Sequence, residues 1–297
     1  MSSVVVENIA KKYGKVDALC GVSFVVPKGE IFGIIGADGA GKTTLFRILT
    51  TLLLADSGTA SVEGLDVVKQ YRDIRSQVGY MPGRFSLYQD MTVEENLAFF
   101  ATLFGTTIKE NYYLIEDIYK QIEPFKDRRA GKLSGGMKQK LALCSALIHC
   151  PTVLFLDEPT TGVDPVSRKE FWTMLRRLKD RGITILVSTP YMDEATLCDR
   201  IGLIADGRFL MIDTPQAIVD SFDKPLYAVS GDRMPQLLRD IRANQAVESC
   251  YAFGDVHHVT LDVEMNLQEY LESCGHQNVV VRPIVASVED CFMKLNK

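Results

Sequence analysis

A glycine-rich segment near the N-terminus combines the residue types that hold phosphate groups. Residues 36–43 read GADGAGKT and fit the pattern G-x-x-x-x-G-K-[ST], directly after a short apolar run. The glycines let successive backbone N–H groups turn toward phosphate oxygens, where the dipole of a following helix adds positive potential. Lys42 is then placed to reach the β- and γ-phosphates of a nucleotide, and the Thr43 hydroxyl to take one Mg²⁺ ligand position.

Two adjacent carboxylates follow a second apolar run. Residues 153–156 are Val-Leu-Phe-Leu, and Asp157 and Glu158 come next. At the end of a buried strand, Asp157 is placed to hold Mg²⁺ through water, whereas Glu158 points elsewhere and is placed to polarise an attacking water molecule. A pair of acids after a strand also fits a purely structural role. The chemistry of this pair therefore depends on the motifs that accompany it.

A third motif lies between the first two. Residues 133–137 read LSGGM and precede an apolar stretch with helical spacing. With this motif the sequence resembles the ATP-binding cassette (ABC) family, whose signature is LSGG. The resemblance runs from about Val4 to Ile218. Tyr13 stands where the family has an aromatic residue that stacks on adenine, and residues 161–165 match the D-loop.

The resemblance implies that ATP is bound between two cassettes arranged head to tail, with the phosphate loop of one facing the signature of the other. Ser134 and the two glycine amides after it would form a second anion-binding helix start, which is useful only if it faces a phosphate. The resemblance also implies Mg²⁺ held by Thr43 and Asp157, and catalysis by Glu158. The residues expected to bind ATP are Tyr13, Gly36, Ala37, Asp38, Gly39, Ala40, Gly41, Lys42, Thr43, Thr44, Ser134, Gly135 and Gly136.

Two segments narrow the resemblance within the family. Residues 161–165 (TGVDP) and residues 286–292 (ASVEDCF) are similar to those of the ATPase subunits of bacterial ABC-2 type exporters, the daunorubicin-resistance group. This implies ATP hydrolysis that drives a separate ABC-2 type membrane permease, with a second cassette in a homo- or heterodimer. It also implies a cytoplasmic protein that is peripheral on the cytoplasmic face of the inner membrane. The permease holds the transport path in such exporters, so the sequence does not identify the cargo.

Two residues that the family uses at the γ-phosphate are replaced. Pro190 stands where the family has a histidine, and proline offers neither a side-chain donor nor a backbone N–H. Gly83 stands where the family has the Q-loop glutamine, and Gln89 is interpreted as an ordinary surface residue. One hypothesis is an asymmetric pair, in which this chain binds ATP at a weakened site and lends its signature to a partner cassette. The alternatives are a homodimer that tolerates both replacements because Glu158 remains, and a scaffold that binds ATP with little or no hydrolysis.

The elements that must position these motifs alternate between strands and helices. β-Branched residues on either side of Gly14 predict an antiparallel pair, and the later apolar runs predict βαβ units. The expected strands cover 4–9, 21–26, 31–35, 153–156 and 183–187, and the expected helices cover 42–54 and 167–180. Helical spacing of apolar residues from 93 to 149 predicts a helical subdomain at about 85–150. The expected fold is an α/β P-loop NTPase cassette with a mixed sheet.

The pattern changes near residues 221–224, which predicts a domain boundary between 1–220 and 221–297. The second part is predicted to contain, in order, a strand, a helix, two strands, a helix and a strand, which is the split βαβ or ferredoxin-like order. These elements are expected at 226–229, 234–243, 247–251, 256–263, 267–274 and 279–281, with a last helix at 288–295. We expect a small α+β domain with a regulatory or dimerisation role.

Composition and charge exclude several classes of protein. The chain has 297 residues, of which 46% are hydrophobic and 24% charged, as is typical of a folded globular protein. Its net charge of -5 provides no general basic field for nucleic acid, and the Lys and Arg residues of the 167–180 helix fit a solvated face. Seven scattered cysteines favour free thiols in a reducing compartment, and the four histidines show no metal-ligand spacing. No export signal or membrane-length apolar run is visible.

Overall fold

The chain folds as two units, Met1–Pro215 and Gln216–Lys297, in a computed structural model that describes residues 1–263 and 265–296. The sequence predicts the boundary after residue 220, whereas in the structure it falls at the start of α7 (Pro215–Asp220). Helix α7 groups with the second unit because it bonds to that unit's last helix, α10 (Val288–Leu295). Ile218 is buried, and its carbonyl oxygen accepts a hydrogen bond from Cys291 Sγ at 3.3 Å.

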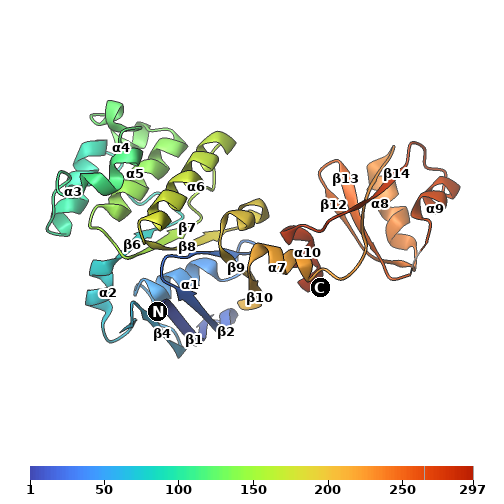
Figure 1. Cartoon of the computed structure of the whole chain (residues 1–297), viewed down its shortest axis with the longest axis horizontal. Helices are drawn as coiled ribbons and strands as arrows, with labels where there is room; N and C mark the ends of the chain where they lie inside the picture. Colours follow the sequence, from blue (N-terminus) through green and yellow to red (C-terminus); the bar gives the residue numbers. More distant parts are fainter. Residues whose placement is uncertain (264, 297) are drawn as a thin grey trace. The chain divides into compact units, whose positions relative to one another are not determined.

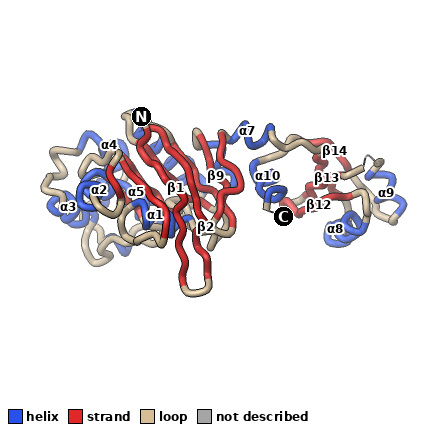
Figure 2. The backbone as a smooth tube through the Cα atoms, turned by 90° about the horizontal axis from the view of Figure 1, so that it is seen from below, coloured by secondary structure: helices blue, strands red, loops and turns tan. Residues whose placement is uncertain are grey.

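An antiparallel sheet forms one layer of the first unit. It contains β1 (Ser2–Tyr13), β2 (Val16–Pro27), β4 (Ser57–Val62) and β5 (Leu65–Asp66), in the order β2-β1-β4-β5. The pairing of β1 with β2 confirms the predicted antiparallel start, and the two strands form a long hairpin (Figure 2). Apolar residues at alternate positions along β2 are buried, as the two-residue period of a strand requires.

The second sheet of this unit carries the candidate site. Its order is β10-β9-β3-β8-β7-β6, with β10 antiparallel to β9 and the other neighbours parallel. The strands are β3 (Ile31–Ile35), β6 (Val78–Met81), β7 (Val153–Asp157), β8 (Thr184–Thr189), β9 (Arg200–Ala205) and β10 (Arg208–Asp213). Every residue of β3, β7 and β8 is buried. Because these three strands are parallel, the segments that follow them meet at one edge of the sheet.

The main hydrophobic core joins both sheets through α1 (Lys42–Leu49). Phe46 of this helix packs edge-on against Phe155 of β7, with ring centroids 5.6 Å apart. The helix ends well before residue 54, which corrects the sequence prediction. Thr51 adopts a left-handed conformation with φ of 63°, and a residue in that conformation ends an α-helix.

Helices α3 to α5 form the helical subdomain that the sequence predicts between β6 and β7 (Figure 1). They are α3 (Val93–Leu103), α4 (Tyr112–Tyr119) and α5 (Gly135–Leu147). Helix α3 begins with a capping box, in which Thr92 and Glu95 exchange hydrogen bonds. The unit also contains α2 (Tyr71–Gln77), α6 (Pro165–Asp180) and short 3₁₀ segments at Glu123–Phe125, Ala130–Lys132 and Met192–Leu197.

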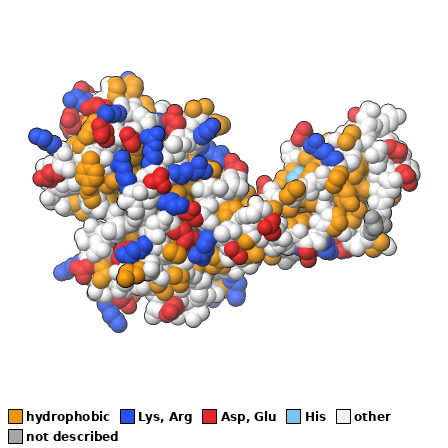
Figure 3. Space-filling view, in the orientation of Figure 1, with side chains coloured by type: hydrophobic (Ala, Val, Ile, Leu, Met, Phe, Trp, Pro, Cys, Tyr) orange, Lys and Arg blue, Asp and Glu red, His pale blue; other side chains and the backbone are white. Residues whose placement is uncertain are grey.

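The surface of the first unit carries charges of both signs. Lys and Arg side chains are interspersed with Asp and Glu over its visible face (Figure 3). Along α6, Arg177 Nη1 lies 3.5 Å from Asp117 Oδ2, and Lys179 Nζ lies 2.6 Å from Asp199 Oδ1. These cations therefore belong to surface ion pairs, as expected for a solvated helix face. Within the described part of the chain, no helix has both the length and the apolar character needed to cross a membrane.

The second unit is a four-stranded antiparallel sheet with helices packed on it (Figure 2). Its elements follow the predicted order of strand, helix, two strands, helix and strand. They are β11 (Leu226–Ser230), α8 (Met234–Ala243), β12 (Val247–Phe253), β13 (Val256–Leu261), α9 (Leu267–Ser273) and β14 (Val280–Ile284). The strand order is β12-β13-β11-β14, so β11 lies between β13 and β14. A separate core that includes Leu237, Ile241 and Val259 holds the helices to the sheet.

Candidate nucleotide-binding site

The glycine-rich loop connects β3 to α1 and passes close to other backbone segments. Gly41 caps α1 with φ of 103°, and a Cβ added there would lie 2.3 Å from the carbonyl oxygen of Ala18. A Cβ added at Gly36 would lie 2.2 Å from the carbonyl oxygen of Ile204. Only glycine fits at these two positions, because the neighbouring atoms are backbone and cannot move aside. Within this turn the Ala40 amide donates to the carbonyl oxygen of Ala37 at 3.2 Å, and the Gly36 amide donates to that of Thr189 at 3.3 Å.

Lys42 is the cation at the centre of this loop. Its side chain is only 3% exposed, and Nζ donates hydrogen bonds to the carbonyl oxygens of Gly36 at 2.8 Å and Ala37 at 3.0 Å. The same Nζ lies 3.3 Å from Glu158 Oε1 and 4.0 Å from Asp38 Oδ1. The buried Lys42 ammonium group therefore lies close to the carboxylates of Glu158 and Asp38.

The two acids at the end of β7 point in different directions. Asp157 is 2% exposed, and its Oδ1 accepts a hydrogen bond from Ser188 Oγ at 2.5 Å. Glu158 is 23% exposed and faces Lys42. The backbone of Glu158 is left-handed, with φ of 50°, which is strained for a residue other than glycine. This turn separates a buried carboxylate from one that reaches the loop.

Lys42 and Glu158 line one open cavity of about 430 Å³, whereas Asp157 is not among its lining residues. Tyr13 also lines it and is 45% exposed, with Lys11 Nζ 5.9 Å from the centroid of its ring. The other residues of the predicted set that line it are Asp38, Gly39, Gly41, Lys42, Thr43, Thr44 and Glu158. A cation, an aromatic ring and a cavity of this size fit a nucleotide. The Thr43 hydroxyl and the nearby carboxylates are oxygen donors, which suit Mg²⁺.

The predicted signature does not line this cavity. Ser134 caps α5, and its Oγ accepts a hydrogen bond from the Met137 amide at 3.4 Å. A Cβ added at Gly136 would lie 2.9 Å from Ser167 Oγ, so the signature packs against the start of α6. The structure therefore brings most of the phosphate loop, Tyr13 and Glu158 together around the cavity, and the signature of the same chain does not line it. The other predicted site residues that do not line the cavity are Gly36, Ala37, Ala40 and Asp157.

Gly83 and Pro190 are the positions at which the resemblance implies missing family residues, and both belong to segments that approach the end of β7. A Cβ added at Gly83 would lie 3.1 Å from the carbonyl oxygen of Asp157. Pro190 follows β8, whose Ser188 accepts hydrogen bonds from the Glu158 amide through its carbonyl oxygen at 3.0 Å and through Oγ at 3.1 Å. Ser188 was not singled out in the sequence. Its place at the carboxyl end of a strand parallel to β7 is the signal that would have found it.

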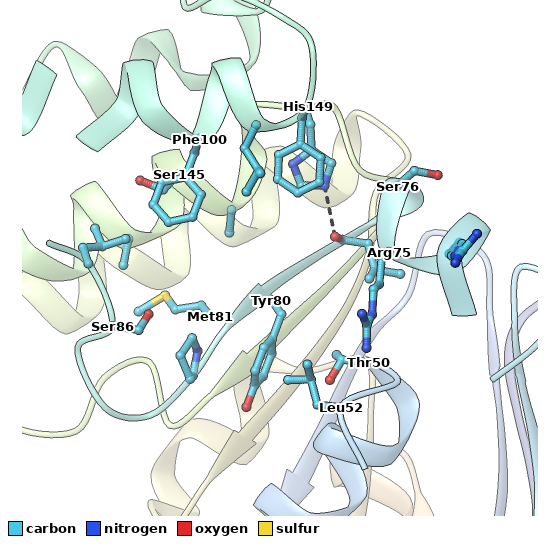
Figure 4. Close-up of a pocket in the computed structure, with 18 residues that line it drawn as sticks. Thr50, Leu52, Arg75, Ser76, Tyr80, Met81, Ser86, Phe100, Ser145 and His149 are labelled. Atoms are coloured by element: carbon cyan, nitrogen blue, oxygen red, sulfur yellow. Dashed lines mark hydrogen bonds between the residues drawn. The ribbon is translucent and has the colours of Figure 1, made fainter. Parts of the chain in front are cut away.

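A larger groove of about 630 Å³ lies beside the site, between β6 and the helical subdomain (Figure 4). Tyr80 and Met81 of β6 line one side, and Phe100 and His149 line the other (Figure 4). Burial, and then the charge of Asp157, raises the pKa of Tyr80 to about 12, so its hydroxyl stays neutral. Burial lowers the pKa of His149, whose Nε2 lies 3.0 Å from the carbonyl oxygen of Val78. The groove is therefore largely apolar and uncharged at its centre.

Histidines and cysteines form no metal centre in the part of the chain that the structure describes. No group of three or more His, Cys, Asp or Glu side chains is arranged there to hold a metal ion. His258 and His276 instead bond to Asp290 and Asp240, each at 2.7 Å.

Comparisons with known proteins identify the family to which the chain belongs. The family model described as "ABC transporter" matches residues 19–161. The probable multidrug ABC transporter ATP-binding protein YbhF of Escherichia coli (strain K12) is 42% identical over 214 residues, which cover 70% of this chain and 36% of YbhF. The chain therefore spans little more than a third of that relative.

Other matches extend further. The daunorubicin resistance ATP-binding protein DrrA2 of Streptomyces coeruleorubidus is 39% identical over 308 residues, which cover 97% of this chain and 93% of DrrA2. A solved structure described as the ATP binding subunit of an ABC transporter superposes with a TM-score of 0.67 at 27% identity, covering 74% of this chain and 92% of that one. The first unit thus has the α/β fold of ATP-binding cassettes, and the chain belongs to the family of ABC transporter ATP-binding proteins.

Proposed function

We propose that this chain binds and hydrolyses ATP to drive a separate ABC-2 type membrane permease, and that it does so at the cytoplasmic face of the inner membrane. The observation that carries the proposal is the position of Lys42, whose ammonium group lies between the carbonyls of the phosphate loop and the Glu158 carboxylate. An ATP polyphosphate that enters the loop would compete with Glu158 for this cation. Glu158 would then be free to accept a proton from an attacking water molecule.

Other groups of the site bind and orient the nucleotide. Tyr13 offers its ring to the adenine, and the loop amides with Thr44 surround the phosphates. Mg²⁺, when bound, neutralises charge on the β- and γ-phosphates, and Thr43 and Asp157 are the residues that we expect to hold it. Ser188 fixes the Asp157 carboxylate from the neighbouring strand. The signature of a second cassette would complete the site, because Ser134 of this chain does not line its own cavity.

The replacements at Pro190 and Gly83 lead us to propose that the site turns ATP over slowly. Proline has no donor to offer to a γ-phosphate, and glycine has no side chain to orient a water molecule. The Gly83 backbone lies against Asp157, so a longer side chain there would require the loop to shift. A second cassette that keeps both family residues would supply the faster site, with the signature of this chain completing it.

We propose that the groove beside β6 receives an amphipathic helix of the permease. Most of its lining residues are apolar, which suits one face of a helix, and Arg72 and Arg75 among them suit acidic residues on that helix. Tyr80 and Met81 line the groove, and the chain then continues through Pro82 to Gly83, which contacts Asp157. A movement of the docked helix would thus be transmitted to the site through residues 81–83.

For the second unit we propose a ferredoxin-like class and a role in dimerisation or regulation. Its element order and the position of β11 between β13 and β14 support this class.

Phosphate release by the purified chain tests the proposed ATPase. The unmodified chain should release phosphate from Mg-ATP more slowly than about 10 per second, a typical enzyme rate. Pro190→His should raise the rate about fivefold, if the restored donor contributes roughly 1 kcal/mol in the transition state. Glu158→Gln should abolish release and serves as the background. Brisk release by the unmodified chain alone would refute the weakened site, and release that survives Glu158→Gln would refute the assignment of Glu158.

A further inference from the structure

A buried carboxylate outside the cavity connects two loops of the site. Glu194 follows β8 closely, and only 1% of its surface is exposed. Its Oε1 accepts a hydrogen bond from Thr160 Oγ1 at 2.8 Å, and its Oε2 accepts one from Thr189 Oγ1 at 2.7 Å. Both threonines are buried. Each carboxylate oxygen therefore holds one loop, since Thr160 comes shortly after Glu158 and Thr189 directly precedes Pro190.

Further contacts fix the turn that contains Pro190. Thr189 Oγ1 also accepts a hydrogen bond from the Tyr191 amide at 3.1 Å, which closes the turn around the proline. Arg168 of α6 donates to Glu194 Oε1 from Nε at 3.1 Å and from Nη2 at 3.0 Å. The same guanidinium lies 4.3 Å from the centroid of the Tyr191 ring. Glu194 and Arg168 thus hold this turn against α6.

The loop on the other side is attached to Glu158 directly. The Thr161 amide donates to the carbonyl oxygen of Glu158 at 3.2 Å, and the Glu158 amide donates to that of Ser188 at 3.0 Å. Glu158 itself is held in the strained left-handed conformation. Such a conformation persists only where the surrounding structure determines it from several sides. The bond from Thr160 to Glu194 is one of these constraints.

We propose that Glu194 is a positioning residue for ATP hydrolysis, which keeps Glu158 and the Pro190 turn in a fixed relation. The inference rests on the proposed function, because it concerns the same site. A carboxylate is an acceptor only, so both threonine hydroxyls must donate to it, and the two bonds set the orientation of both loops. Apolar packing would hold the loops together without fixing that orientation.

Substitutions of the two hydroxyl donors test the proposal while Glu194 keeps its own charge and its contact with Arg168. Thr160→Val and Thr189→Val each remove one bond to Glu194 at nearly constant volume, and Thr189→Val also removes the bond from the Tyr191 amide. Thr184→Val is the matched control, since Thr184 is also buried in β8 and its Oγ1 accepts a bond from the Gly29 amide at 3.0 Å. In the full chain we expect each test variant to lower kcat for Mg-ATP about tenfold with the ATP dissociation constant unchanged. We expect the double variant to lose less than the product of the two single effects, because both bonds serve one link. A merely structural role would lower the thermal midpoint of all three variants and leave kcat at the value of the control.

Amide hydrogen exchange separates this proposal from the proposed function. If Glu194 links the loops, Thr189→Val should speed exchange several-fold in residues 158–163 as well as in residues 188–191. Thr184→Val should leave the first segment unchanged. Faster exchange only in the loop that carries the substitution would overturn the link. An unmodified chain that releases no phosphate above the Glu158→Gln background would refute the proposed function, and the exchange measurement would still decide whether Glu194 connects the loops.

Discussion

At the scale of single residues, the site is organised around one buried cation. Lys42 Nζ contacts two loop carbonyl oxygens and lies 3.3 Å from a Glu158 carboxylate oxygen. The left-handed backbone of Glu158 turns this carboxylate toward the loop, while Asp157 stays buried against Ser188. In the proposed function, binding of a polyphosphate would change the partner of Lys42 and the surroundings of Glu158 together. Occupation of the loop would then be coupled to the release of Glu158 as the proposed base.

Lys42→Ala should weaken Mg-ATP binding about 100-fold, because a charge-assisted hydrogen bond to a phosphate contributes roughly 2–3 kcal/mol. The variant leaves two carbonyl oxygens and Glu158 facing the phosphates without a cation. Equilibrium titration of the purified chain measures the effect. The matched control is Lys12→Ala, since Lys12 pairs with Asp17 on the exposed hairpin and should change affinity less than twofold. Equal dissociation constants for the Lys42→Ala variant and the unmodified chain would contradict the assignment of the phosphate loop.

Residues within one local motif could be predicted from the sequence, whereas residues brought close by strand order could not. Asp38, Gly39, Gly41, Thr43 and Thr44 line one cavity with Lys42, because their spacing in the chain sets their geometry. Ser188 and Gly83 reach Asp157 only because β8 and β6 lie on either side of β7. Nothing in the local sequence encodes that order. The link through Glu194 has the same origin.

At the scale of elements, local signals again decided what could be predicted. The bounds of α8 and α10 match the prediction, and α10 begins at a capping box formed by Ser287 and Asp290. Strands β4, β5, β6, β9 and β10 were not predicted. Most of β4 is small or polar (SGTASV), and such strands form because a partner strand is available rather than because of their own sequence.

A buried acid marks the start of β3. Glu30 is 8% exposed, and its Oε1 has no hydrogen-bond partner among the described residues. Burial raises the pKa of Glu30, and Asp199 adds to this effect, while Arg200 at 3.6 Å opposes it. The folded protein therefore binds the Glu30 proton more tightly than the unfolded chain does. Stability from this group is present at low pH and is lost as the pH rises through the raised pKa.

Glu30→Gln should therefore raise the thermal midpoint of the chain at pH 7, because the glutamine resembles the protonated acid and removes a buried charge. The gain should shrink as the pH falls through the raised pKa of Glu30, because the unmodified Glu30 then takes up its proton. Calorimetry at several pH values measures the difference. Glu170→Gln is the control, since Glu170 pairs with Lys140 at an exposed site and should show no such trend. If Glu30→Gln instead has a lower thermal midpoint than the unmodified chain at pH 7, the attraction between Glu30 and Arg200 stabilises the fold by more than burial of the Glu30 charge destabilises it.

At the scale of the whole molecule, the phosphate loop and the LSGG signature lie apart from each other in the first unit. The phosphate loop and Glu158 line the cavity, whereas Ser134 caps α5 outside it. A helix start gains from facing an anion, and Ser134 is not among the residues that line the cavity with the phosphate loop. The proposed pairing with a second cassette would use both surfaces at once. In that proposal, Pro190 would weaken the site of this chain, and its signature would remain suited to a partner.

The division of the chain near residue 215, rather than 220, leads to a prediction about the second unit. Val219 and Asp220 of α7 line one cavity with Tyr227 and Ile284 of the sheet, and Ile218 is buried and bonds to α10. A fragment of residues 216–297 should therefore melt at a higher temperature than a fragment of residues 221–297. Burial of one isoleucine contributes about 1.5–3 kcal/mol, which corresponds to roughly 10 °C for a domain of this size. Circular dichroism melts of the two fragments measure the difference. Equal midpoints would show that α7 adds nothing to the second unit, and the boundary would then lie where the sequence predicts it.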